Sequence, residues 1–191
     1  MAGGIELSSD EAGRAPSGAP VSTPSDDAFC SIERTVGIVG DRWVLLILRQ
    51  VLAGGMTRFT DLVKSLGVAP NILTNRLEML TRSGVLERRE YREPGSRPRM
   101  SYHPTAAGRE LLVVLAALGQ WGDDHIPPVG GVGQTRETTR DGEPVRVGFV
   151  TDAALLLPAE EISFVYTEVG RDRIRAAAAE AEGRPQGQGR P

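Results

Sequence analysis

The sequence has one cysteine, one lysine (Lys64), only 5% aromatic residues and no long apolar run. One cysteine excludes an internal disulfide framework and any zinc site built from several thiolates. The longest apolar stretches, residues 43–48 and 111–119, fall short of the roughly 18 residues that a membrane-spanning helix needs. The N-terminus shows no basic segment followed by an apolar one, so no secretory signal is visible and a cytoplasmic location is expected.

Groups that carry catalysis are equally scarce. The chain has two histidines, and we find neither a Gly-rich phosphate loop nor a convergent acid–base pair. The run Asp123-Asp124-His125 superficially suggests a metal cluster, but adjacent residues at a helix end point in different directions and match no known ligand spacing. We therefore expect no enzyme, no metal and no cofactor.

The 191 residues favour one compact domain with appendages. Residues 1–25 are rich in Gly, Ala, Ser and Pro and are expected to be a disordered tail. Residues 26–125 hold the periodic apolar pattern. Residues 126–170 form an extension punctuated by Gly and Pro, and residues 171–191 combine an Ala-rich helix, near 171–181, with a disordered tail.

Within the periodic part, apolar spacing predicts four helices before any strand. The first spans residues 26–39 and ends at Gly40. Asp41 caps the second, and Thr57 caps the third. Gly67-Val68 then breaks the chain, and the fourth helix starts near Ala69 with Pro70 in its first position, where a missing N–H is harmless.

The third and fourth helices, joined by a short turn that contains Gly, have the helix-turn-helix arrangement. Two strand candidates follow, residues 85–91 and 100–103, around a connection rich in arginine. A basic β-hairpin directly after a helix-turn-helix is a wing, which contacts the phosphate backbone or a minor groove. The expected fold is mainly α with a small β-hairpin wing, a winged helix-turn-helix domain with a C-terminal extension.

Thr105 caps a long helix that runs to about Asp124, and its middle, Leu111–Leu118, is apolar on every side. Such a helix must be covered on two sides, and a partner subunit is the simplest cover. The expected partners are therefore a second copy of the chain and double-stranded DNA, with no membrane. The residues assigned to the homodimer interface are Ile32, Val36, Leu111, Leu115, Leu118 and Trp121.

Basic charge gathers in one region, although the net charge of the chain is −3. Residues 76–109 contain eight arginines and four glutamates. The fourth helix is the candidate recognition helix, the one that enters the major groove. The candidate DNA contacts are Asn71, Thr74, Asn75, Arg76 and Arg82 in this recognition helix, and Arg92, Arg97 and Arg99 in the wing. The alternative is an ordinary solvated helix surface, and for Arg88 and Arg89 ion pairs with neighbouring glutamates are at least as well supported.

An ordered set of residues carries a family resemblance over about residues 30–125. It comprises Cys30, Gly40-Asp41-Arg42-Trp43, Arg58-Phe59 with Leu62, Leu73-Thr74-Asn75-Arg76-Leu77 with Leu80 and Gly84, the wing, Tyr102, Thr105, Gly108 and Trp121-Gly122. With these residues the chain resembles the HxlR-type family of bacterial transcriptional regulators, winged-helix proteins related to MarR-type repressors. The chain departs from the family at Ala69, where a capping Ser is common.

The resemblance implies a homodimeric regulator that binds a palindromic operator and responds to a small-molecule effector. By the same resemblance it is a repressor. It also implies that Cys30 senses oxidants or electrophiles. The alternative for Cys30 is a small apolar residue, because nearby acidic residues disfavour the thiolate. The alternative function is a small-molecule or protein-binding module whose winged helix no longer binds DNA.

The extension shows two alternating patterns, Val145–Phe149 after the turn at Asp141-Gly142 and Ile162–Tyr166. They predict a small β unit that packs on the dimer or covers a ligand pocket. A decoration unrelated to the family is the alternative.

Overall fold

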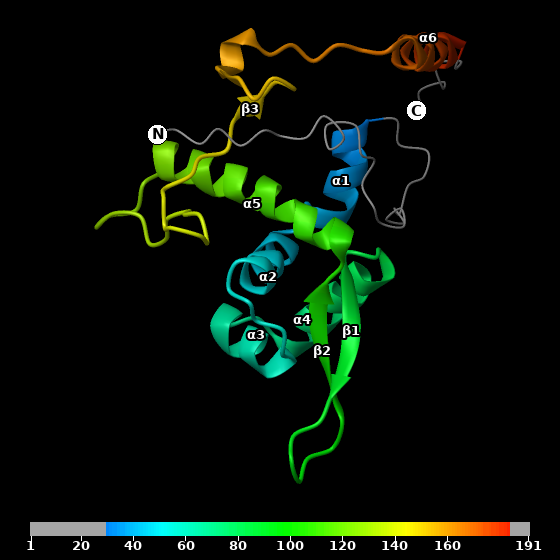
Figure 1. Ribbon diagram of the computed structural model, residues 1–191. Coiled ribbons are helices and arrows are strands. Elements are labelled where there is room, and N and C mark those ends of the chain that lie inside the picture. The colour runs from blue at the N-terminus through cyan, green and yellow to red at the C-terminus, as the bar shows by residue number, and fades with distance from the viewer. Residues whose placement is uncertain (1–29, 184–191) are drawn as a thin grey trace.

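The computed structural model describes residues 30–183 and contains an N-terminal winged-helix body followed by an extension (Figure 1). The body consists of α1 (Ser31–Val39), α2 (Arg42–Leu52), α3 (Phe59–Leu66), α4 (Pro70–Arg82), β1 (Leu86–Tyr91), β2 (Arg99–Pro104) and α5 (Ala106–His125). The extension holds β3 (Phe149–Val150), β4 (Leu156–Leu157), the short 3-10 helix η1 (Ala159–Glu161) and α6 (Glu168–Gly183). Among the described residues no helix is long and apolar enough to cross a membrane. The tails expected at residues 1–25 and near the C-terminus lie largely or wholly outside the described range.

The first two helices meet at a tight junction. The N-cap of α1 is Cys30, so the described helix begins later than predicted, and residues 26–29 lie outside the described range. Gly40 does end α1, but with φ of −73° it is right-handed, not left-handed as its usual terminal position implies. A Cβ at Gly40 would lie 2.6 Å from the carbonyl oxygen of Val36. Close packing therefore explains this glycine better than backbone freedom does.

The helix-turn-helix is formed by α3 and α4. The prediction that Thr57 caps α3 is wrong, because Arg58 is the N-cap and its side chain makes no cap hydrogen bond. The Thr57 carbonyl instead accepts from the backbone N–H of Tyr102 at 2.8 Å, which ties the chain to β2. Gly67 ends α3 in the left-handed region, with φ of 61°, where glycine is favoured. As predicted, α4 begins with Pro70 after an N-cap at Ala69.

The wing is the antiparallel pair β1–β2, in which Leu86 faces Pro104 and Tyr91 faces Arg99. An isolated bridge between Arg58 and Ser101 attaches this pair to the start of α3. Both strands lie within a residue or so of the predicted ranges. The hairpin therefore projects from the body at a defined angle, with residues 92–98 at its tip.

The long helix α5 is held against the start of the wing by its first turn. The Thr105 hydroxyl accepts from the Gly108 N–H at 3.1 Å, which confirms the predicted cap, and donates to the Gly84 carbonyl at 2.7 Å. A Cβ at Gly108 would lie only 2.1 Å from the Val85 carbonyl oxygen. Glycine is therefore what allows α5 to approach the body this closely.

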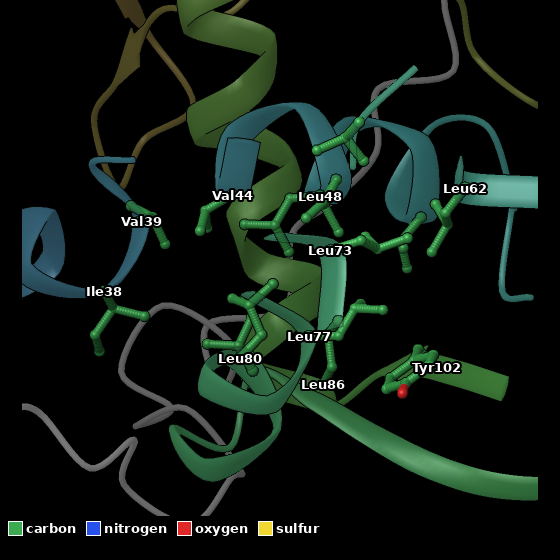
Figure 2. Close-up of a cluster of buried hydrophobic side chains, with 14 residues drawn as sticks. Ile38, Val39, Val44, Leu48, Leu62, Leu73, Leu77, Leu80, Leu86 and Tyr102 are labelled. Atoms are coloured by element: carbon green, nitrogen blue, oxygen red, sulfur yellow. The ribbon is translucent and has the colours of Figure 1, made fainter. Parts of the chain in front are cut away.

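The core is shared by all elements of the body except α5, which packs on it through half-buried residues. Figure 2 shows side chains from α2, α4 and β1 converging, with Leu73, Leu77 and Leu80 lining the inner side of α4. All three of these leucines are fully buried. Because one side of α4 is fixed in the core, its opposite side must face outward.

The extension contains a small β unit, as predicted, but its strands are not the predicted segments. The segments Val145–Val147 and Ile162–Tyr166 form no strand, and β3 contains only the last residue of the first pattern. The partner of β3 is β4, which the alternation did not indicate. The turn at Gly142 is present, with φ of 73°, and the Ala-rich segment is helical in α6.

Candidate nucleic-acid interface

The outer side of α4 carries a row of exposed polar side chains. Asn71, Thr74, Asn75 and Arg82 are all exposed, as helical spacing opposite the three buried leucines requires. The Thr74 hydroxyl donates back to the Pro70 carbonyl at 2.9 Å. Among the described residues the side chains of Asn71, Asn75 and Arg82 have no protein partner. These groups are therefore available for contacts outside the chain.

Arg76, the fifth residue predicted in α4, is engaged within the protein. Its Nε and Nη2 donate to the two carboxylate oxygens of Asp41 at 3.0 and 2.9 Å. The same carboxylate caps α2 by accepting from the N–H groups of Trp43 and Val44. The hydrogen bond from Arg76 is the largest influence that lowers the pKa of Asp41, and the backbone donors add to it. The pKa of Arg76 is raised by the same pair. Arg76 thus fixes α4 to the start of α2, and its contact with DNA stays a prediction.

The acidic residue on α4 has a cationic neighbour. Glu78 lies 3.8 Å from Arg88, whose guanidinium also stacks over the Tyr102 ring at 5.8 Å from the ring centre. The next arginine, Arg89, pairs with Glu87 on the same strand at 2.5 Å. The ion-pair alternative for Arg88 and Arg89 is therefore the one found in this structure. Pairing with Arg88 offsets the repulsion that Glu78 would exert on a phosphate.

The arginines at the tip of the wing differ in whether their side chains have a partner within the protein. The Arg92 Nε donates to the Ser96 carbonyl at 3.1 Å and so closes the tip. The side chains of Arg97 and Arg99 are exposed and form no ion pair or hydrogen bond with any described residue. These two guanidinium groups have their full hydrogen-bonding capacity available for an anion.

The recognition helix and the wing border a shared concavity of about 430 Å³. Its lining includes Phe59 and Thr60 of α3, Thr74 of α4, and Tyr91 and Arg99 of the wing. Sequence reasoning missed the role of Arg58 near this concavity, because its ion-pair partner lies 35 positions away in the sequence. Arg58 forms an ion pair with Glu93 at 2.8 Å and stacks on Tyr91, so it braces the wing against α3.

A second exposed surface lies on α1 and α5 and is apolar. Ile32 and Val36 are more than half exposed, and Leu118 and Trp121 are 52% and 60% exposed. Leu111 and Leu115, also assigned to the dimer interface, are half-buried and pack on the core of their own chain. The more exposed apolar residues of this part of α5 are Leu112, Val113 and Val114. The homodimer stays a prediction, and so does the assignment of the predicted residues to its interface.

Cys30 is exposed at the N-terminal end of α1, beside this apolar surface. Its role as a sensor stays a prediction. Within residues 30–183 no three His, Cys, Asp or Glu side chains are grouped so that they could hold a metal ion.

Comparison with known proteins identifies the architecture. A family model described as HxlR-like helix-turn-helix matches residues 38–129. An uncharacterised HTH-type transcriptional regulator from Synechocystis is 35% identical over 99 residues, which cover 51% of this chain and 71% of that protein. The chain belongs to the HxlR-like helix-turn-helix family. This is a family of transcriptional regulators rather than enzymes, in line with the expectation from the sequence.

Another HxlR-like relative is Mb3122 of Mycobacterium bovis, also described as an uncharacterised HTH-type transcriptional regulator. It is 39% identical over 97 residues, or 51% of this chain. The match spans only 60% of the length of that relative. The winged-helix part is therefore what these proteins share.

Two solved structures extend the likeness beyond the winged helix. The crystal structure of PA1607 is 32% identical, covers 74% of this chain and 97% of its own, and has a TM-score of 0.65. PA1374 from Pseudomonas aeruginosa is 34% identical, covers 75% and 99%, and has a TM-score of 0.53. An alignment over 74% of 191 residues is longer than residues 1–125, so it includes part of the extension. Part of the extension is thus shared with these two proteins.

Proposed function

We propose that this HxlR-like protein is a homodimeric transcription regulator, a repressor, that binds a palindromic operator in duplex DNA. In this proposal α4 enters the major groove and the wing tip contacts the phosphate backbone. Asn side chains pair bidentately with adenine and Arg side chains with guanine in that groove.

The observation that carries the proposal is the joint surface of α4 and the wing. It combines unpartnered Asn71 and Asn75 on one element with the unpaired Arg97 and Arg99 on the other. The Asp41–Arg76 and Arg58–Glu93 ion pairs hold both elements on the same body.

The apolar surface of α1 and α5 supports the homodimer. Large apolar side chains gathered in one exposed patch mark an interaction site. A two-fold pair would present two recognition helices to half-sites one helical turn of DNA apart, about 10 base pairs. An effector would act by shifting the population between two spacings of those helices.

Selection of binding sites from randomised duplexes tests the proposal. We expect the enriched sequences to be inverted repeats with half-sites about 10 base pairs apart. Enrichment of single, unrepeated half-sites would reject the two-fold arrangement. No enrichment at low salt would reject DNA binding and favour the alternative, a binding module with a winged-helix fold.

Sensing by Cys30 is a separate part of the proposal, supported by the exposure of its thiol at the edge of the α1 surface. Any disulfide would have to join two chains, because the chain has one cysteine. Alkylation with N-ethylmaleimide is expected to weaken operator binding of the wild type and to leave Cys30→Ser unaffected. Unchanged affinity of the alkylated wild type would remove Cys30 from the mechanism.

A further inference from the structure

The last part of the extension, residues 148–183, exposes most of its large apolar side chains. We call this segment the C-terminal arm. Phe164 is 89% exposed, Val165 80% and Tyr166 60%, and Phe149 and Leu156 of its two strands are also exposed. Its sheet has two strands of two residues each. An isolated two-stranded hairpin is marginal in water, so the arm needs a surface to pack on.

The arm starts from a fixed point at the end of α5. The Gln120 side chain donates to the Val147 carbonyl at 3.0 Å and accepts from the Val147 N–H at 2.9 Å. Two ion pairs tie the preceding segment to the same helix end, Arg136–Asp123 at 3.0 Å and Arg146–Asp124 at 2.5 Å. These contacts place the root of the arm next to Trp121, at the edge of the apolar surface of α1 and α5.

From that root the arm runs on the side of α5 away from α2, α3 and α4 (Figure 1). The helix α1, which carries Ile32 and Val36 of the apolar surface, also reaches to this side of α5 (Figure 1). That surface is hollowed by a concavity of about 440 Å³ lined by Ile32, Val36, Leu45, Val114 and Leu118, among others. The arm and the surface are thus two uncovered apolar features of one chain, continuous through the end of α5.

We propose that the C-terminal arm of each protomer packs across the α1–α5 surface of a second copy of this chain. The inference rests on the proposed homodimer and names the segment that completes it. A stable interface uses about 20–30 residues on each side, which the exposed residues of two helices alone do not supply. In a two-fold dimer each arm packs on the other protomer in the same way. This exchange covers both the arm and the α1–α5 surface of each protomer.

The charge of the arm argues against DNA as the surface on which it packs. Residues 148–183 contain seven acidic residues and three basic ones, so the arm is net negative. A polyanion would be repelled there, whereas an apolar helix surface on another protomer would not.

Photo-crosslinking between unlabelled and ¹⁵N-labelled protomers of the full chain tests the inference. The Cys30→Ser/Phe164→Cys variant carries a benzophenone maleimide on its arm and is mixed with ¹⁵N-labelled wild type under conditions that exchange subunits. We expect crosslinked peptides that join the arm of one isotopic form to α1 or α5 of the other. Cys30→Ser/Val165→Cys repeats the test at a second position in case the first variant does not fold.

The control is Cys30→Ser/Ser96→Cys, which puts the same probe on the wing tip and is expected to give no crosslink between protomers. Crosslinks confined to one chain, or none at all from the arm, would overturn the inference. Sedimentation equilibrium on the same samples separates the two proposals. A dimer without crosslinks from arm to partner rejects the arm exchange alone, whereas a monomer rejects the homodimer itself.

Discussion

Arginine side chains of the candidate interface fall into two groups by their contacts. Arg58, Arg76 and Arg88 each face a carboxylate within the protein, and their role is to position α3, α4 and the wing. Arg82, Arg97 and Arg99 face no carboxylate among the described residues, and their guanidinium groups are left for contacts with DNA. The sequence shows these arginines but not which of them form ion pairs. Arg58–Glu93 and Arg76–Asp41 each join residues 35 positions apart, which local patterns do not reveal.

Replacing Asp41 by Asn tests the positioning pair. Asn can still cap α2, but it loses the charge that holds Arg76. The native pKa of Asp41 lies below its ordinary value of 3.8, so the pair stabilises the fold above that pH and the stabilisation is lost as the pH falls through the native pKa. Because both side chains are about a third exposed, we expect Asp41→Asn to lose about 1 kcal/mol or less at pH 7.

Urea unfolding of both proteins at pH 7 and at several lower pH values measures this difference. The gap in unfolding free energy should close below pH 3.8. A gap of constant size down to pH 3 would contradict the assignment of the stabilisation to the Asp41 carboxylate.

Gly108→Ala tests the close approach of α5 to the wing. The new Cβ meets the Val85 carbonyl, a backbone atom that cannot rotate away, so we expect a loss of about 1–3 kcal/mol, as for other overpacked sites. Gly122→Ala in the same helix is the matched control, since its Cβ would have nothing within 4 Å. Thermal unfolding of both variants checks the prediction, and equal effects of the two substitutions would contradict it.

At the scale of elements, the helices and the wing were predictable because each has a buried side with its own period. The leucines of α4 recur at helical spacing and all reach the core. The strands of the extension were not predictable, because alternation marks a strand only when a neighbour pairs with it. Ile162–Tyr166 alternates but has no partner strand, while Leu156 and Leu157 pair with β3 without alternating.

The start of α4 offers a stabilising substitution. Ala69 has the extended backbone of an N-cap, with φ of −60° and ψ of 136°, but no side-chain acceptor. We expect Ala69→Ser to raise the unfolding free energy by about 1 kcal/mol, because its hydroxyl can accept from an unpaired N–H in the first turn. Urea unfolding measures the gain, and Ala153→Ser, in an exposed turn, is the control expected to show none. A gain shared by both variants would point to a general effect of serine and not to a cap.

At the scale of the whole molecule, the structure has two exposed surfaces with opposite character. The helix α4 and the wing lie on one side of α5, and the C-terminal arm lies on the other (Figure 1). Exposed polar side chains gather on α4 and the wing, and exposed apolar side chains on α1, α5 and the arm. The sequence predicted a polar surface on the fourth helix and the wing and an apolar one on the first helix and the long helix. It could not separate Leu111 and Leu115, which pack on the core, from their exposed neighbours, because a helix that is apolar all round gives no phase. In the proposed homodimer, one side assembles two copies while the other faces DNA.

The salt dependence of DNA affinity tests the central claim most directly. Each phosphate contact contributes about 0.9 to the slope of log affinity against log salt concentration, through release of counterions. On a selected operator we predict that Arg97→Ala and Arg99→Ala each reduce the slope by about 0.9 per lost contact in each half-site. Arg140→Ala, which removes the same charge from the extension, should leave the slope unchanged. Equal slopes for the wild type and both wing variants would contradict the account.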